Sequence, residues 1–183
     1  ERMITKEIEA FDLEQICESG QCFRMEQTGP GEFQVAAGSR GLRLSQRGKT
    51  VTFFCGEDEF EKMWRRYFDL DEDYASCLNQ AESMDQYLAQ AAAGAKGIRI
   101  LRQDLWEMIV SFLISQQNNI PRIRRCIENL CRTYGKRKEA EGFSFYTFPG
   151  PEVLAGLEED ALKPCNLGYR SKYVVRTARQ IYE

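Results

Sequence analysis

Residues 111 to 125 read Ser-Phe-Leu-Ile-Ser-Gln-Gln-Asn-Asn-Ile-Pro-Arg-Ile-Arg-Arg and set the organisation of the second half of the chain. An apolar segment runs into uncharged amides, and arginines then follow a proline. Upstream, Asp104 with Glu107 three residues later predicts the N-cap and capping-box partner of a first helix. Residues 105 to 114 are apolar nearly all round, so we expect this helix to be buried.

A second helix is predicted directly after the amides. Asn118 or Asn119 can cap it, Pro121 is tolerated in its first turn, and Gly135 can end it. Two helices therefore meet at a polar corner whose carboxamide and guanidinium groups suit the edges of nucleic-acid bases. Polar turns between helices are also common without any binding role, so the corner alone does not establish one.

Positive charge begins at the same corner. Residues 121 to 138 contain seven basic residues against the single acidic residue Glu128, although the whole chain has a formal net charge of −3. The basic residues are Arg122, Arg124, Arg125, Arg132, Lys136, Arg137 and Lys138. A basic run is often only a solvated face, but one that starts at an amide-rich corner favours contact with phosphate.

Five short strings match one family in order and approximate spacing. They are Gly20-Gln21-Cys22-Phe23-Arg24, Leu101-Arg102-Gln103-Asp104, Gln117-Asn118-Asn119-Ile120-Pro121-Arg122-Ile123, Tyr146-Thr147-Phe148-Pro149 and Leu167-Gly168-Tyr169-Arg170-Ser171-Lys172-Tyr173. On these strings the chain resembles the 8-oxoguanine DNA glycosylases from end to end. One string would be weak support, whereas five in register make coincidence improbable.

The resemblance implies base-excision repair of oxidised DNA. The intact protein would flip 8-oxoguanine out of the duplex, excise it opposite cytosine through a lysine nucleophile, and nick the strand by β-elimination. In the family a helix-hairpin-helix element supplies that lysine and an assisting aspartate, and no Leu-Pro-Gly-Val-Gly type hairpin occurs in the 183 residues. The last helical pattern reaches Glu183 without a cap, and the chain begins with Glu1 rather than methionine. We therefore expect a fragment without catalytic residues, which keeps lesion and opposite-base recognition and does not excise bases.

The lesion-pocket residues implied by the resemblance are Gly20, Gln21 and Phe23, with Arg24 in support. Guanine presents a bare acceptor at N7, whereas 8-oxoguanine carries a proton there and becomes a donor. The family places a glycine carbonyl at that point, and this carbonyl corresponds to Gly20. Ser19 and Gly20 could equally be a turn that opens the next strand.

The resemblance also implies a set of residues that meet the strand opposite the lesion. Arg122 and Arg170 would donate to the estranged cytosine, and Tyr169 would be the aromatic wedge beside it, although Tyr169 could instead be a core aromatic. Gln117 stands where the family typically has an asparagine that fills the vacated space. The complete predicted set is Gln117, Asn118, Asn119, Arg122, Tyr169 and Arg170.

The predicted fold class is α+β. An antiparallel sheet domain with short helices is expected over residues 1–72, followed by an incomplete all-α domain over residues 73–183 that stops before the helix-hairpin-helix. The predicted strands are 22–26, 32–35, 42–45 and 51–55, separated by Gly-rich turns. The predicted helices are 11–18, 57–68, 74–78, 84–93, 105–114, the segment up to residue 134, two short pieces around residues 153 and 160, and a last helix from about residue 170.

Composition excludes several classes of function. Histidine is absent, which excludes Ser-His-Asp triads and histidine metal sites. The seven cysteines lack a Cys-x-x-Cys pair and are expected to be reduced thiols, so no metal or cofactor is predicted. No apolar run is long enough to cross a bilayer and no signal peptide is present, which predicts a cytoplasmic protein that acts with DNA inside the cell.

The expected partner is double-stranded DNA that contains oxidised guanine, without a membrane or an obligate protein partner. Two alternatives stay open at this stage. The first is a glycosylase of the same superfamily that acts on alkylated purines. The second is a DNA-binding module without catalytic activity.

Overall fold

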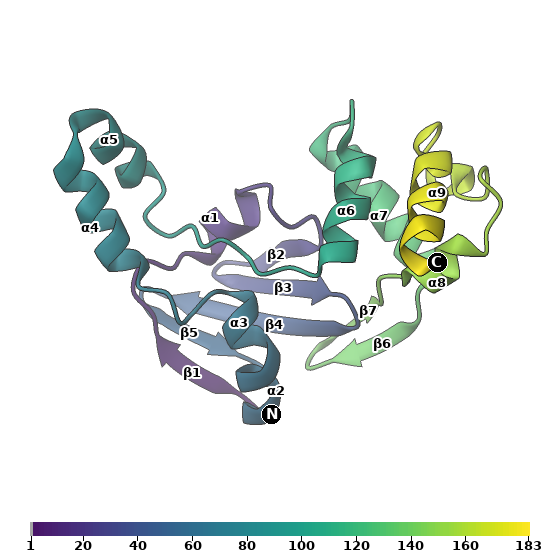
Figure 1. The fold of residues 1–183 in the computed structure, drawn as a ribbon. Helices are drawn as coiled ribbons and strands as arrows, with labels where there is room; N and C mark the ends of the chain where they lie inside the picture. The colour runs from purple at the N-terminus through teal and green to yellow at the C-terminus, as the bar shows by residue number, and fades with distance from the viewer. Residues whose placement is uncertain (1) are drawn as a thin grey trace. The chain divides into compact units, whose positions relative to one another are not determined.

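The computed structural model describes residues 2–183, which form two compact units (Figure 1). The first unit contains residues 2–35 and Leu42–Arg102, and the second contains Ala36–Gly41 and the chain from Gln103 onward. The predicted boundary after residue 72 falls inside the first unit, which also holds the two helices that follow that point.

A five-stranded antiparallel sheet, in the order β1-β5-β4-β3-β2, is the main element of the N-terminal half (Figure 1). Its strands are β1 (Ile4–Glu7), β2 (Met25–Gly29), β3 (Glu32–Ala37), β4 (Arg40–Arg47) and β5 (Thr50–Phe53). The register pairs Leu44 with Phe53, and both side chains are fully buried, as alternation of apolar residues along a strand requires. The predicted α+β class is confirmed.

Strand β1 is the one strand of this sheet that the sequence did not predict. It contains a single apolar residue, Ile4, so its four residues show no alternation. It lies at the edge of the sheet and, among the described strands, pairs with β5 alone. Its residues pair in register with β5, and the Thr5 and Thr52 hydroxyls lie 3.1 Å apart across the two strands.

Helices cover part of the same unit. They are α1 (Leu13–Glu18), the continuous helical segment α2 (Glu57–Glu59), η1 (Phe60–Trp64) and α3 (Arg65–Tyr67), and the pair α4 (Tyr74–Met84) and α5 (Gln86–Gly94). Apolar residues of the predicted helix over residues 57–68 belong to the core: the rings of Phe60 and Phe68 pack edge-on against Phe53 at 4.9 and 6.0 Å. Helix α4 extends to Met84, six residues beyond its predicted end.

The second unit contains helices α6 (Leu105–Ser115), α7 (Ile120–Tyr134), α8 (Pro151–Ala155) and α9 (Arg170–Tyr182), with the 3-10 turn η2 (Lys163–Cys165). The predicted caps are present: Asp104 accepts from the Glu107 N–H, Asn119 accepts from the Arg122 N–H, and Gly135 ends α7. The Glu107 carboxylate accepts a hydrogen bond from the Gly38 N–H at 2.7 Å.

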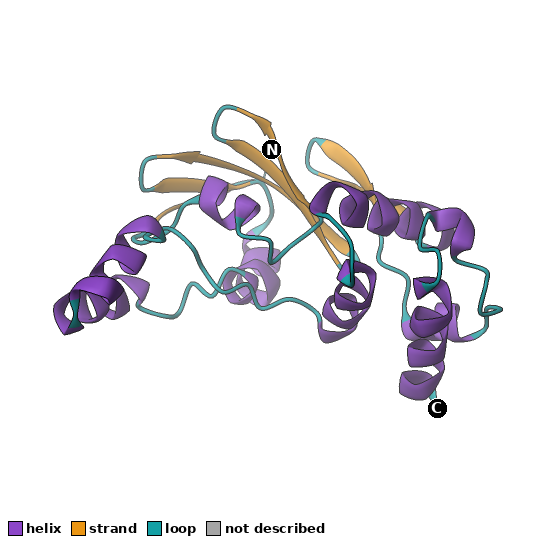
Figure 2. Cartoon of the chain, turned by 90° about the horizontal axis from the view of Figure 1, so that it is seen from above, coloured by secondary structure: helices purple, strands orange, loops and turns teal. Residues whose placement is uncertain are grey.

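Two expectations for this unit were wrong. The chain after residue 73 is not helical throughout, because β6 (Arg137–Ala140) and β7 (Phe143–Tyr146) form a separate two-stranded ribbon (Figure 2). Gly142 enables the turn between them with φ of +89°. The aromatic rings of β7 cover Gly41, where an added Cβ would lie 2.6 Å from Phe145.

Helix α6 is also not buried on all sides. Val110 and Ile114 are fully buried, but Leu105 and Phe112 are 68% and 65% exposed in the described chain. Within its unit α6 packs against α7 and α9, so a single face of this 11-residue helix is covered. Apolar composition alone does not reveal which faces of a helix find a partner. Among residues 2–183, no helix combines the length and apolar character needed to span a bilayer.

Candidate nucleic-acid interface

The predicted lesion residues begin in a short loop at the end of α1, residues 19 to 22, here called the Gly20 loop. Ser19 closes α1, since its N–H and its hydroxyl both donate to the Ile16 carbonyl, at 3.3 and 2.7 Å. Gly20 follows with φ of +78°, a conformation that favours glycine. Gly20 is exposed, and a Cβ built on it would meet no atom within 4 Å. Glycine is therefore needed here for backbone conformation rather than for space.

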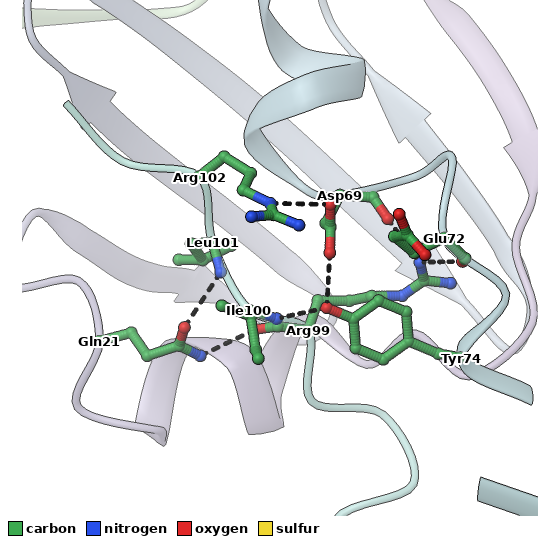
Figure 3. A network of polar contacts seen from close by, with 8 residues as sticks. All are labelled: Gln21, Asp69, Glu72, Tyr74, Arg99, Ile100, Leu101 and Arg102. Carbon is green, nitrogen blue, oxygen red and sulfur yellow. Dashed lines mark hydrogen bonds and ion pairs between the residues drawn. The ribbon is translucent and has the colours of Figure 1, made fainter. Parts of the chain in front are cut away.

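Gln21 directs its carboxamide onto the protein itself (Figure 3). Its Nε2 donates to the Arg99 carbonyl at 2.8 Å, and its Oε1 accepts from the Leu101 N–H at 3.0 Å. The same Nε2 also lies 3.1 Å from the Ser19 hydroxyl oxygen. Both the nitrogen and the oxygen of the amide therefore attach the Gly20 loop to a second segment of the chain. Phe23, the third predicted lesion-pocket residue, is half-buried.

The second segment is the extended stretch Gly97 to Arg102, here called the strap, which leads from α5 toward α6. Arg99 anchors it: this side chain is only 3% exposed and its guanidinium donates to four backbone carbonyls. The acceptors are Ala10, Asp69, Glu72 and Glu9, at 3.0, 2.9, 3.1 and 2.8 Å. Burial lowers the pKa of Arg99 from its ordinary value. The neighbouring Tyr74 and Asp69 act in the opposite direction and raise this pKa. Nothing in the sequence had singled out Arg99.

Asp69 and Tyr74 continue the polar network around the strap (Figure 3). Asp69 has φ of +53°, and its carboxylate accepts from the Tyr74 hydroxyl at 2.7 Å and from Arg102 Nε at 3.0 Å. The Tyr74 oxygen accepts in turn from the Ile100 N–H at 3.0 Å. Burial and the hydrogen bond to Asp69 raise the pKa of Tyr74, so the phenol keeps its proton.

The predicted opposite-strand residues gather in the second unit, at the turn from residue 116 to residue 119, here called the amide corner. Asn118 Nδ2 donates to the Ile114 carbonyl at 3.0 Å and satisfies the end of α6, while Asn119 Oδ1 accepts from the Arg122 N–H at 3.0 Å and begins α7. Gln117 lies between the two caps with φ of +48°, which is uncommon for a residue with a side chain. Such strained positions cluster at functional sites.

Arg170 lies buried behind this corner. It is 3% exposed, and its Nε and Nη2 donate to the Gln116 carbonyl at 2.9 and 2.6 Å. Nη2 also donates to the Gln117 carbonyl at 2.9 Å. In this structure Arg170 therefore binds the carbonyl end of α6, where a cation is favoured by the helix dipole.

Tyr169 and Arg122 lie at the surface of the same corner. Tyr169 is 49% exposed, its hydroxyl lies 3.5 Å from Gln117 Oε1, and the Arg170 guanidinium stacks 4.6 Å from its ring. Arg122 is exposed in the first turn of α7 and forms no ion pair within residues 2–183. All six predicted opposite-strand residues thus meet at the amide corner or in the turn that it caps.

Acidic partners neutralise part of the basic run. Arg132 pairs with Glu128 at 3.0 Å and Arg137 pairs with Glu139 at 3.1 Å. Arg125, like Arg122, is exposed on α7 and has no ion pair in the described part of the chain. The unneutralised positive charge of α7 therefore lies toward the amide corner.

Comparison with known proteins matches both halves of the chain to families of DNA repair proteins. Residues 3–109 match the model of the 8-oxoguanine DNA glycosylase N-terminal domain, and residues 110–182 match the HhH-GPD superfamily of base excision DNA repair proteins. The N-glycosylase/DNA lyase of Saccharomyces cerevisiae is 34% identical over 147 residues, which cover 76% of this chain and 39% of the yeast protein.

Solved structures agree with this assignment. The 8-oxoguanine glycosylase/lyase of Clostridium acetobutylicum in its apo-form superposes with a TM-score of 0.93 at 34% identity, covering 100% of this chain and 64% of that one. Its complex with double-stranded DNA containing cytosine opposite 8-oxoguanine gives a TM-score of 0.89. The 3-methyladenine DNA glycosylase of Archaeoglobus fulgidus, at 16% identity and a TM-score of 0.73, shares the fold alone.

The chain spans less than two thirds of the length of these relatives. The two family matches together extend over residues 3–182 and contain the five sequence strings and both groups of site residues. The chain belongs to the 8-oxoguanine DNA glycosylase family of the HhH-GPD superfamily.

Proposed function

We propose that the protein excises 8-oxoguanine opposite cytosine in DNA and nicks the strand as a lyase, and that this chain supplies recognition of the lesion and of the opposite base. Membership of the family over residues 3–182 is the observation that carries the proposal. The relative from Clostridium acetobutylicum, named as an 8-oxoguanine glycosylase/lyase, supports the substrate at 34% identity.

The proposed lesion contact is the Gly20 carbonyl. An acceptor there would bind the N7–H of 8-oxoguanine and would face the bare N7 acceptor of guanine unfavourably. The exposure of Gly20 and the open space around it would allow a flipped base to approach the backbone closely. Phe23 would contribute an apolar surface to the same pocket.

The proposed opposite-strand surface is the amide corner with Arg122, Tyr169 and Arg170. Arg122 is exposed and can donate to cytosine without breaking an ion pair in the described chain. Arg170 would have to break its hydrogen bonds to the Gln116 and Gln117 carbonyls before it could donate to the base. We therefore propose Arg122 as the primary donor, with Tyr169 as the wedge and Gln117 beside it.

Arg122→Ala tests the opposite-base role, with Arg125→Ala as its matched control on the same helix. Arg122→Ala should weaken binding to an 8-oxoguanine·cytosine duplex by about 1–3 kcal/mol and leave an 8-oxoguanine·adenine duplex less affected. Arg125→Ala should weaken both duplexes alike and reduce the salt slope of binding by about 1, as loss of a phosphate contact does. Fluorescence anisotropy titrations at several salt concentrations give both quantities.

An equal loss on both duplexes for Arg122→Ala would instead identify Arg122 as a phosphate contact.

A trapping experiment tests whether this chain contains a nucleophile. The family resemblance implies a catalytic lysine in a helix-hairpin-helix element, and we predicted no such element in the 183 residues. Borohydride should therefore trap no covalent adduct between this chain and lesion DNA. A trapped adduct would show that the chain contains its own nucleophile. Parallel titrations with a 3-methyladenine duplex would test the alkylated-purine alternative.

A further inference from the structure

We propose that Gln21 and Arg99 are positioning residues that fix the direction of the Gly20 carbonyl and thereby set the preference for 8-oxoguanine over guanine. The proposal rests on the proposed role of Gly20 in reading the lesion. Gln21 was predicted as a lesion-pocket residue, and here we assign it a role through its hydrogen bonds to the strap, at the Arg99 carbonyl and the Leu101 N–H.

Arg99 makes the strap a fixed support. Its four acceptors lie on two chain segments, residues 9–10 and 69–72, so one guanidinium joins three segments of the first unit. The guanidinium also stacks 4.3 Å from the Tyr74 ring. Because a buried cation must keep its hydrogen-bond partners, the strap cannot shift without a large energetic cost.

Gln21 attaches the Gly20 loop to that support (Figure 3). Its carboxamide accepts from residue 101 and donates to residue 99, which is how a neighbouring strand would pair with the two sides of Ile100. The side chain therefore substitutes for a paired strand. A third contact, from Nε2 to the Ser19 hydroxyl oxygen, places Gly20 between two side chains that are bonded to one another.

Glycine needs such support because it enforces no conformation by itself. A residue without Cβ can leave φ of +78° at little cost, and rotation of the peptide would move the carbonyl oxygen that is proposed to read N7. Recognition groups must be held to about 0.5 Å and 10–20° of their working geometry, and side chains around them provide that constraint. The Gln21 carboxamide follows Gly20 directly in the chain and is held by the strap, so it can supply this constraint.

Gln21→Met tests the proposal because methionine keeps the length of the side chain and removes its hydrogen bonds. Gln15→Met is the matched control: Gln15 on α1 also bonds the strap, accepting from the Gly97 N–H at 3.2 Å, but it is not adjacent to Gly20. The ratio of affinities for 8-oxoguanine·cytosine and guanine·cytosine duplexes should fall about tenfold in Gln21→Met and stay unchanged in Gln15→Met.

A second pair of variants tests Arg99. Arg99→Lys keeps the charge but loses the guanidinium fork, and we expect it to lower the same affinity ratio. Arg102→Lys changes an arginine on the same strap whose side chain bonds Asp69 and is 54% exposed, and we expect it to leave the ratio unchanged. Thermal unfolding of all four variants separates loss of stability from loss of discrimination.

The outcomes separate the two proposals. If the wild-type chain shows no preference for the lesion, the role of Gly20 in the proposed function fails. If the wild type discriminates and Gln21→Met discriminates equally well, the positioning role fails instead. Amide hydrogen exchange measured without DNA tests the positioning role independently of binding. Exchange at Leu101 and in residues 19–22 should be faster in Gln21→Met than in the wild type. Unchanged exchange would overturn the proposal.

Discussion

The two arginines that the family resemblance predicts to meet the estranged cytosine have different surroundings in the folded chain. Arg122 is exposed in the first turn of α7, whereas Arg170 is 3% exposed and donates to the carbonyls of Gln116 and Gln117. The acceptors lie more than 50 residues earlier in the chain, so no local pattern could have revealed this difference. Identical side chains therefore carry different proposed duties because of their tertiary contacts.

Gly97 and Gly94 lie three residues apart and provide a test of the strap at the same scale. A Cβ on Gly97 would lie 2.1 Å from the Asp12 Cβ, whereas a Cβ on Gly94 would meet nothing within 4 Å. Gly97→Ala should lower the free energy of unfolding by about 1–3 kcal/mol because α1 and the strap must separate. Gly94→Ala should be neutral or stabilising by up to about 1 kcal/mol, since alanine favours the helix. Urea denaturation measures both, and equal effects would contradict the close packing at Gly97.

At the scale of elements, local chemistry set the helix ends and long-range contact set the rest. The caps Asp104 and Asn119 and the end at Gly135 were predicted because each depends on bonds within one turn. The β6–β7 ribbon was missed because its first strand, Arg-Lys-Glu-Ala, has no apolar alternation. Its partner strand and the packing of Phe145 over Gly41 decide that structure.

Asn119 provides the element-scale prediction. Its side chain is the N-cap of α7, so Asn119→Ala should destabilise the chain by about 1 kcal/mol. Asn119→Ser keeps a capping oxygen, so the free energy of unfolding should fall by only a few tenths of the loss expected for Asn119→Ala. Chemical denaturation followed by circular dichroism compares the two variants. Equal stabilities of the alanine and serine variants would show that the capping bond contributes nothing measurable.

At the scale of the whole molecule, burial rather than sequence distinguishes the seven thiols. Six are buried and Cys77, on α4, is exposed. Burial, followed by the charge of Glu59, raises the pKa of Cys55 from 9.0 to about 11. At pH 9 only about 1% of Cys55 would then be thiolate, the form that reacts with alkylating reagents.

Thiol labelling should therefore proceed in two separate phases. With a maleimide or a disulfide reagent near pH 8, one equivalent should react rapidly, and the other six should react only as the chain unfolds. Cys77→Ser should abolish the rapid phase. A rapid phase of several equivalents, or one that survives in Cys77→Ser, would contradict the buried positions of the other thiols.

The α+β class, four strands of the sheet, the two helices that meet at the amide corner and the family could all be predicted before any coordinates were known. These features depend on short-range physics: side-chain alternation, capping bonds and turn residues act over a few positions. The five matching strings could likewise be read without coordinates.

The hydrogen-bond partners of the buried and half-buried polar side chains became known from the folded chain alone. In the fold, the Gln21 carboxamide bonds the strap, the Arg99 guanidinium bonds four backbone carbonyls, and Arg170 bonds the end of α6. One face of α6 is exposed, although the apolar composition of this helix had predicted burial. Burial and hydrogen bonding depend on residues that are distant in sequence, because a polar group removed from water binds whatever partner the folded chain brings to it.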